Sequence, residues 1–163
     1  MSDRLRNVLF LCTGNSCRSI IGEQLLNHLG YGRFRGYSAG SHPTGQVNPN
    51  AVRALDRRGV NTFGLSSKCW DVFERPDAPE MDIVITVCGN ARGEVCPVWP
   101  GHPLTVHWGL TDPAEFRGGA DETAKVFDAT LNQLERLIEG LLALPDDRLT
   151  AEELNGLLET TPA

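Results

Sequence analysis

Residues 7–18 read NVLFLCTGNSCR, and this stretch decides how the chain folds. Its first five residues form an apolar run rich in strand-forming side chains, which predicts a buried parallel strand. Beyond the polar residues 12–18, apolar side chains return at helical spacing at Ile20, Ile21, Leu25, Leu26 and Leu29. Gly30 is placed to end that helix. The stretch therefore predicts a strand, a loop and a helix in succession.

The same alternation continues along the chain. Further strands are expected at 34–39, 83–87 and 105–108, and further helices at 48–59, 68–73 and 127–141. The helix at 48–59 has the clearest boundaries, because Asn48 can cap it, Pro49 suits its first position and Gly59 can end it. Strands that alternate with helices predict an α/β fold, here a three-layer αβα arrangement around a four-stranded parallel sheet.

Length and composition suit one soluble domain with a short extension. The 163 residues are enough for a full hydrophobic core. A Pro-Asp-Asp break at 145–147 precedes Thr150 and Glu153, whose spacing predicts a capped helix that runs to about Glu159. We therefore expect a domain at 1–145 and a C-terminal extension at 146–163.

Charge and hydropathy exclude several classes of protein. The net charge is −6 and the 15 basic residues are scattered, which argues against a nucleic-acid partner. No apolar run is long enough to cross a bilayer, and the run at 8–11 is too short for a signal peptide, so we expect a cytoplasmic protein. The odd count of five cysteines argues against a disulfide framework and leaves catalytic, redox, metal-binding or buried thiols.

The loop at 12–18 has the composition of an oxyanion-binding site. Converging backbone N–H groups at a helix N-terminus bind tetrahedral anions, Gly14 would allow the turn, and Arg18 offers a planar fork for two oxygens. The same positive field favours the thiolate of Cys12, which we take as the nucleophile, with Ser16 or Ser19 as a hydrogen-bond donor to it. The alternative is a buried cysteine followed by a plain helix cap. The expected anion-binding residues are Thr13, Gly14, Asn15, Ser16, Cys17, Arg18 and Ser19.

Residues 8–19 resemble the signature of low-molecular-weight tyrosine phosphatases and of the arsenate reductases built on the same fold. The resemblance continues through 37–40, 47–49, 86–88 and 107–109 and covers about residues 7–142. It implies the phosphotyrosine phosphatase I fold, a Cys12 that attacks arsenate (or phosphate or sulfate in the same loop), and no cofactor or metal. It also implies that Asp112, in an Asp-Pro pair, protonates the departing oxygen, although such pairs are common in turns.

Two further cysteines separate the two chemistries of the family. Cys88 ends the third expected strand at the same end of the sheet as Cys12, and Cys96 follows across a segment with two glycines. This arrangement resembles that of thioredoxin-coupled arsenate reductases and implies a disulfide relay from Cys12 to Cys88 to Cys96, reset by thioredoxin or by glutaredoxin or glutathione. The alternatives are buried or loop thiols, or a zinc site with His102 and His107 that lacks a close Cys-x-x-Cys pair.

A supporting cluster is expected behind the loop. In some members of the family, residues that match Asn15, Glu23 and Ser38 surround a bound potassium ion, and the position of its carboxylate ligand falls at Lys68 here. A lysine cannot bind a cation, but its ammonium group near Glu23 can replace one. The alternative is an exposed surface lysine.

The expected function is the reduction of arsenate to arsenite for arsenic detoxification. One alternative is a phosphatase that hydrolyses phosphomonoesters, but residues 114–116 read AEF where such phosphatases usually carry paired tyrosines. Another is a non-enzymatic oxyanion-binding regulator, although Cys12, Arg18 and Asp112 supply all the catalytic elements.

Overall fold

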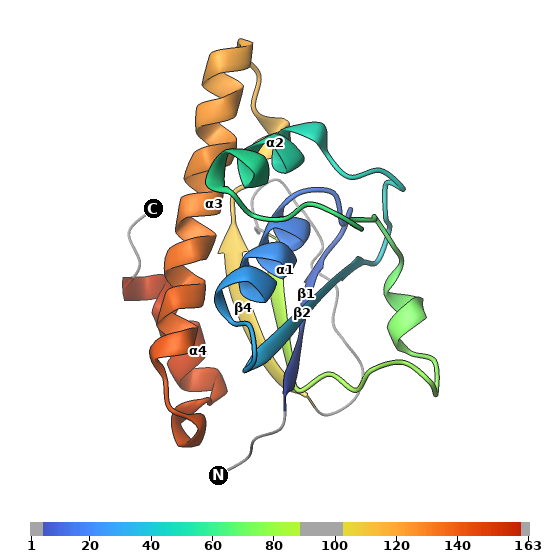
Figure 1. Cartoon of the computed structure of the whole chain (residues 1–163), viewed down its shortest axis with the longest axis vertical. Helices are drawn as coiled ribbons and strands as arrows, with labels where there is room; N and C mark the ends of the chain where they lie inside the picture. The colour runs from blue at the N-terminus through green and yellow to red at the C-terminus, as the bar shows by residue number, and fades with distance from the viewer. Residues whose placement is uncertain (1–4, 89–102, 161–163) are drawn as a thin grey trace.

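The computed structural model describes residues 5–88 and 103–160. Four strands form one parallel sheet in the order β2-β1-β3-β4, with bounds β1 (Arg6–Cys12), β2 (Phe34–Gly40), β3 (Ile83–Cys88) and β4 (Leu104–Leu110). The α-helices of the described ranges are α1 (Arg18–Leu29), α2 (Pro49–Arg58), α3 (Ala120–Ala143) and α4 (Ala151–Thr160) (Figure 1). Short 3₁₀ helices are η1 (Trp70–Phe73), η3 (Pro113–Glu115) and η4 (Asp146–Arg148).

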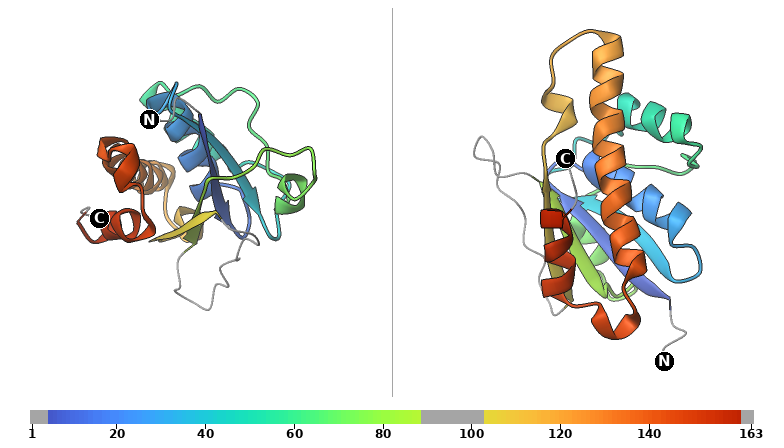
Figure 2. Two further views of the ribbon diagram at one scale, coloured as in Figure 1. Left: turned by 90° about the horizontal axis from the view of Figure 1, so that it is seen from below. Right: turned by 90° about the vertical axis from the view of Figure 1, so that its left-hand side faces the viewer.

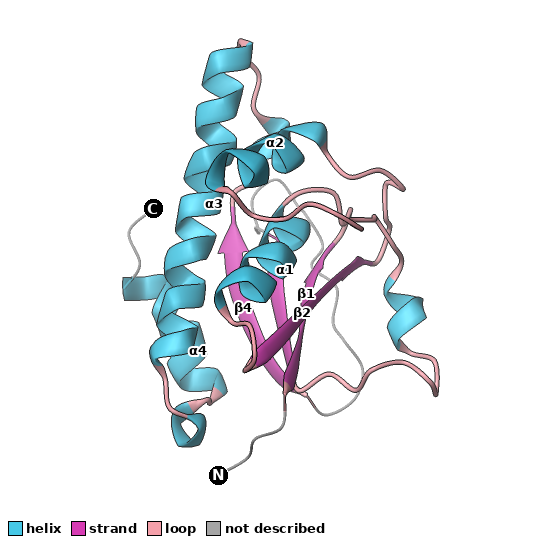
Figure 3. Ribbon diagram, in the orientation of Figure 1, coloured by secondary structure: helices cyan, strands magenta, loops and turns pink. Residues whose placement is uncertain are grey.

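The sheet is covered on both faces, as predicted. Helices α1 and α3 lie on one face and η1 lies on the other (Figures 2 and 3). On the α1 side, Gly22 allows the helix to approach the strand, since an added Cβ would sit 2.7 Å from the ring of Phe10. On the η1 side, Tyr37, Trp70 and Phe73 pack against the buried residues Leu9, Leu11, Ala39, Met81 and Val84. The predicted α/β fold with a four-stranded parallel sheet is confirmed.

Burial on both faces explains why the first strand reads as a continuous apolar run. Strand β1 lies between β2 and β3, and Val8, Leu9, Phe10 and Leu11 are fully buried. Its side chains alternate between the two faces, so neither face can carry polar groups. The decisive stretch is therefore the centre of the sheet.

Local capping sets the helix boundaries where the sequence predicts them. Asn48 Oδ1 accepts a hydrogen bond from the Asn50 N–H at 2.8 Å at the start of α2, and Gly59 ends that helix in the left-handed region with φ of 78°. The Glu153 N–H donates to Thr150 Oγ1 at 3.2 Å at the start of α4. The helix expected at 68–73 is shorter than predicted and reduces to η1.

Helix α4 packs against β4 and α3. The Trp108 Nε1–H donates to the Leu154 carbonyl at 2.8 Å, and Leu154 is fully buried in the main core. The backbone N–H of His107 donates to Asn155 Oδ1, also at 2.8 Å. Residues after the Pro-Asp-Asp break thus contribute to the same packed body. Within the two described ranges, no helix combines the length and the apolar character needed to cross a bilayer.

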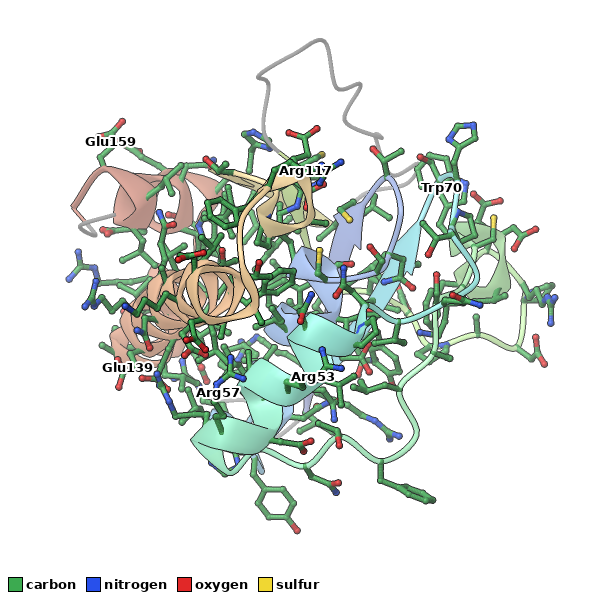
Figure 4. The ribbon with its side chains drawn as sticks, turned by 90° about the horizontal axis from the view of Figure 1, so that it is seen from above. Arg53, Arg57, Trp70, Arg117, Glu139 and Glu159 are labelled. Carbon is green, nitrogen blue, oxygen red and sulfur yellow. The ribbon has the colours of Figure 1, made fainter. Side chains whose placement is uncertain are left out.

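Parallel strands bring distant residues to one end of the sheet. Leu11 of β1 pairs with Thr86 of β3, so Cys12 and Cys88 close neighbouring strands at the same end. Figure 4 looks onto this carboxyl end of the sheet from above, with Trp70 on the η1 side and Arg53 and Arg57 on α2. Ligand sites of open α/β sheets lie at this end.

Candidate active site

The loop between β1 and α1 is held from outside by the segment 41–48. Backbone N–H groups of this segment donate to carbonyl oxygens of the loop: Ser41 to Cys12 (3.3 Å), His42 to Thr13 (2.9 Å), Thr44 to Gly14 (3.0 Å) and Asn48 to Ser16 (2.9 Å). The carbonyl and N–H of a trans peptide unit point in opposite directions. The N–H groups of residues 13, 14, 15 and 17 therefore face away from segment 41–48, toward the inside of the loop.

This arrangement suits an anion. The inward N–H groups lie next to the N-terminus of α1, which begins at Arg18 and carries a partial positive charge. The segment 41–48 has no charged side chain, and residues 41–46, before the 47–49 match, carry no motif in the sequence. Its contribution through backbone contacts alone explains why sequence reasoning missed it.

Gly40 brings the end of β2 against the loop. An added Cβ at Gly40 would lie 2.5 Å from the Thr13 carbonyl oxygen and 3.0 Å from the Asn15 nitrogen. No other residue type fits such a close approach of two backbones. A glycine directly after a predicted strand, at the carboxyl end of the sheet, is the signal that marks this position in the sequence.

Asn15 is the residue that turns the loop. Its φ is 46°, in the left-handed region, whereas Gly14 bends the chain without that conformation. Asn15 is fully buried; its Oδ1 accepts from the Lys68 N–H at 2.8 Å and its Nδ2 donates to Ser19 Oγ at 2.9 Å. Asparagine tolerates this backbone conformation, and these two side-chain bonds hold it there.

Ser19 faces the proposed nucleophile. The Cys12 sulfur lies 3.6 Å from Ser19 Oγ, and Cys12 is buried at the end of β1. Because Ser19 Oγ already accepts from Asn15, its own hydrogen can be directed to the sulfur. Such a bond stabilises a thiolate. Of the two serines considered, Ser16 instead directs its hydroxyl to the sulfur of Cys17, at 3.9 Å.

Arg18 lies across the end of β4. Its Nη1 donates to the Leu110 carbonyl at 2.9 Å, and its Nη2 lies 3.6 Å from Asp112 Oδ2. The Arg18 side chain is 4% exposed, so its orientation is fixed by packing and by its contacts with residues at the end of β4. The role of the Leu110 carbonyl had no side-chain signal in the sequence.

Asp112, two residues after the end of β4, contacts the loop through Cys17. Its Oδ1 accepts from the Ala114 N–H at 3.0 Å and from the Cys17 thiol at 3.5 Å. The carboxylate therefore caps η3, as an Asp-Pro turn would, and also lies beside the loop. Burial and the negative charge of Asp112 raise the pKa of Cys17 to about 12.

Cys88 ends β3 and is fully buried. Its sulfur is disulfide-bonded, whereas Cys12, Cys17 and Cys69 are free thiols. Cys96 and His102 lie outside the described residues. In the part of the chain that the structure describes, no three His, Cys, Asp or Glu side chains gather closely enough to hold a metal ion.

The cluster expected behind the loop is assembled. The Ser38 hydroxyl donates to Glu23 Oε1, and the Lys68 ammonium donates to the carbonyls of Ser38 at 3.2 Å and Ser66 at 2.8 Å. Burial raises the pKa of Glu23, against the effects of Ser38 and Lys68. Burial also lowers the pKa of Lys68, against the charge of Glu23. Desolvation therefore outweighs the mutual attraction in both groups.

The described geometry is that of a known family. The family model for low molecular weight phosphotyrosine protein phosphatases matches residues 7–154. The chain belongs to this family. The match extends beyond residue 142, where the resemblance in the sequence was expected to end, and includes part of α4.

Curated relatives and solved structures narrow the comparison within the family. An arsenate reductase of Shouchella clausii is 36% identical over 127 residues, which cover 78% of this chain and 88% of the relative. A structure described as an arsenate reductase in the phosphate binding state superposes with a TM-score of 0.65 and 26% identity, over 85% of this chain and 97% of the other. The thioredoxin-dependent arsenate reductase of Corynebacterium glutamicum has a TM-score of 0.55 and 30% identity, over 85% of this chain and 64% of the other.

Proposed function

We propose that this protein reduces arsenate to arsenite, with Cys12 as nucleophile and Cys88 as the thiol that resolves the adduct. The observation that carries the proposal is the placement of Cys12 and Cys88 at neighbouring strand ends, with the anion loop around the first. The similarity to arsenate reductases supports it. Its biological role would be arsenic detoxification.

The first step forms a covalent adduct. The inward N–H groups of the loop and the Arg18 guanidinium bind arsenate, and the Cys12 thiolate attacks arsenic(V). One oxygen leaves as water after Asp112 supplies a proton. Asp112 Oδ2 lies 3.6 Å from Arg18 Nη2, which supports a role for Asp112 as the acid next to an anion bound by Arg18.

The second step transfers two electrons. The Cys88 thiolate attacks the sulfur of Cys12, the sulfur–arsenic bond breaks with its electron pair on arsenic, and arsenite leaves as a Cys12–Cys88 disulfide forms. Cys96 then attacks the Cys88 sulfur, which releases Cys12 as a thiolate and forms a Cys88–Cys96 disulfide. The disulfide-bonded state of Cys88, beside the free thiols of Cys12, Cys17 and Cys69, supports a relay that passes through Cys88.

An external dithiol must return the last disulfide to two thiols. We propose thioredoxin, on the strength of the similarity to the thioredoxin-dependent enzyme of Corynebacterium glutamicum. Such a relay works where thiols are kept reduced, which favours the cytoplasm.

Lys68 is proposed to act where some relatives bind potassium. Its ammonium donates to the Ser38 carbonyl, next to the hydroxyl that binds Glu23. A cation at this point would face a like charge, so the residues present do not fit a potassium ion. Rates in matched potassium and sodium salts should therefore be equal, and a faster rate in potassium would contradict this role.

The catalytic unit is proposed to be residues 1–145, with 146–163 as an extension whose helix α4 packs on it. The contacts of Leu154 and Asn155 with β4 support a structural task for the extension. The residues proposed for catalysis all precede it.

A coupled assay tests the proposed function. Reduced protein is mixed with thioredoxin, thioredoxin reductase and NADPH, and NADPH oxidation is followed after arsenate is added. Arsenate-dependent oxidation that is lost in Cys88→Ser and in Cys96→Ser, but kept in Cys69→Ser, supports the relay. Full activity in both relay variants would point to an external thiol that attacks Cys12 directly.

A phosphatase with the same nucleophile is the second candidate, favoured by the family match itself. Water rather than Cys88 would then release phosphate from Cys12. Hydrolysis of p-nitrophenyl phosphate that exceeds arsenate reduction in kcat/KM, and that is independent of Cys88, would favour this candidate.

A further inference from the structure

Cys17 links two segments that lie far apart in the chain. It precedes α1, and its sulfur lies 3.5 Å from Oδ1 of Asp112, 95 residues later. On its other side the sulfur accepts a hydrogen bond from the Ser16 hydroxyl at 3.9 Å. Cys17 is 3% exposed, so solvent does not compete strongly for either contact. The relay described above does not use this thiol.

We propose that Cys17 is a positioning residue whose thiol holds the Asp112 carboxyl group beside the oxyanion loop, ready to protonate the departing oxygen. This inference rests on the proposed function and assigns Cys17 a task within it. Its thiol is the donor, and Asp112 Oδ1 is the acceptor.

The protonation state of Cys17 suits a permanent donor. Burial and the charge of Asp112 raise its pKa to about 12, so it keeps its proton over the whole working range of pH. Cys12 and Cys17 are both buried but face opposite partners: a serine hydroxyl for Cys12 and a carboxylate for Cys17. The loop thus holds one thiol for nucleophilic attack and one for hydrogen bonding.

The pattern of contacts selects one carboxyl oxygen as the proton carrier. Asp112 Oδ1 is engaged by both the Cys17 thiol and the Ala114 N–H, while Oδ2 faces the Arg18 guanidinium at 3.6 Å. When an oxyanion binds to Arg18, Oδ2 is the oxygen that borders it. The proton to be transferred therefore belongs on Oδ2, and Cys17 keeps Oδ1 turned away.

The charged and titratable groups that face Asp112 among the described residues come from the loop and α1. They are the Arg18 guanidinium and the Cys17 thiol, with Cys12 close enough to act electrostatically on Cys17. Removing a donor from a carboxylate favours its protonated form. In a reaction that needs the protonated acid, loss of the Cys17 thiol moves the alkaline limb of the pH profile upward.

The test compares Cys17→Ala with Cys17→Ser in the coupled arsenate assay across pH. For Cys17→Ala we expect kcat to fall roughly 3- to 10-fold and the alkaline limb to rise by roughly 0.5–1 pH unit, the size of one lost weak hydrogen bond. Cys17→Ser keeps a donor and should restore both. The inhibition constant of inorganic phosphate should stay unchanged, because the backbone N–H groups remain. Cys69→Ser is the matched control for a thiol outside the loop.

Three results would overturn the proposal. One is an unmoved alkaline limb in Cys17→Ala. Another is a weaker phosphate affinity with normal kcat, which would make Cys17 part of the loop shape. A third is a further fall in kcat when Cys17→Ala is added to Asp112→Asn, since the two changes should not add if they remove one interaction.

A second readout separates this proposal from the proposed function. The titration of the Asp112 carboxyl carbon is followed by NMR, with the signal assigned by its loss in Asp112→Asn. An upward shift in Cys17→Ala supports the contact even if wild-type protein fails to turn over arsenate, and an unchanged titration overturns it. If Cys17→Ala does not fold, Cys17→Ser should keep the wild-type titration, because its hydroxyl is also a donor to Oδ1, and an upward shift in this variant overturns the contact.

Discussion

Cys12 and Cys88 end neighbouring strands of one sheet, yet their surroundings differ. Cys12 leads into a polar loop with Ser19 3.6 Å from its sulfur and the start of α1 close by. Cys88 closes a strand of six buried residues that are apolar apart from Thr86. The first environment suits the anion site that we propose, whereas Cys88 presents its sulfur at the end of an apolar strand. Two cysteines at one end of a sheet can therefore act in successive steps rather than compete for the same step.

The largest expected effect comes from breaking the first site. Cys12→Ser should lower both arsenate reduction and any phosphate-ester hydrolysis by at least about 10³-fold, because both begin with attack by its sulfur. The coupled NADPH assay and p-nitrophenyl phosphate hydrolysis measure the two activities. Residual arsenate reduction above one tenth of wild type would mean that another thiol captures arsenate.

Breaking the second site should separate the two thiols. Cys88→Ser should abolish steady-state arsenate reduction but leave the affinity for inorganic phosphate unchanged, because the anion loop does not use Cys88. Turnover is measured in the coupled assay and affinity by isothermal titration calorimetry. A loss of phosphate binding in this variant would show that the two strand ends form one binding site.

Asp112→Asn should have a smaller effect than either cysteine. Asparagine preserves the contact with the Ala114 N–H but cannot supply a proton, so kcat should fall roughly 10²-fold or more. Stopped-flow measurement of the first turnover checks this expectation. If the rate stays within about twofold of wild type, Asp112 serves only as a turn residue.

The smallest effect is expected behind the loop, at Lys68. In Lys68→Met the buried carboxylate of Glu23 loses a nearby positive charge, while the Lys68 N–H to Asn15 remains. Burial already raises the pKa of Glu23, so the free energy of unfolding falls as pH rises through that pKa and Glu23 ionises. Without the Lys68 charge, this fall should be larger. We expect a decrease of about 1–3 kcal/mol in the free energy of unfolding at pH 8 and less at pH 5.

Urea unfolding at both pH values measures this difference. Lys125→Met, on the exposed surface of α3, is the matched control for the loss of a lysine. An equal destabilisation at pH 5 and pH 8 would mean that Lys68 supports the loop by packing and not by its charge.

Local signals in the sequence were sufficient for most of the fold. The apolar run before Cys12 predicted β1, and Asn48, Pro49 and Gly59 predicted α2 at its observed bounds, because caps and strand burial act over a few residues. The short η1 was overestimated, since its length depends on packing against β2 and not on its own periodicity.

The site was predictable in part. Cys12 and Arg18 were proposed from residue type and spacing and Asp112 from the family resemblance, but the groups that contact them come from distant segments. The left-handed turn fell at Asn15 and not at Gly14, because the backbone of Lys68, 53 residues away, holds the Asn15 side chain. The orientation of the loop by segment 41–48 and of Arg18 by the Leu110 carbonyl uses backbone groups, which every residue has and no motif marks.

Asn155 presents its side-chain oxygen to the backbone N–H of His107 on β4, one of the two edge strands of the described sheet. An open strand border is a template on which a second chain can add its own strand. Helix α4 accepts a hydrogen bond from one backbone N–H of this edge and is held there by the Trp108 indole, so a second strand cannot pair at this point. Helix α4 therefore covers part of this strand edge, and we expect a chain cut at residue 145 to aggregate more readily through β4.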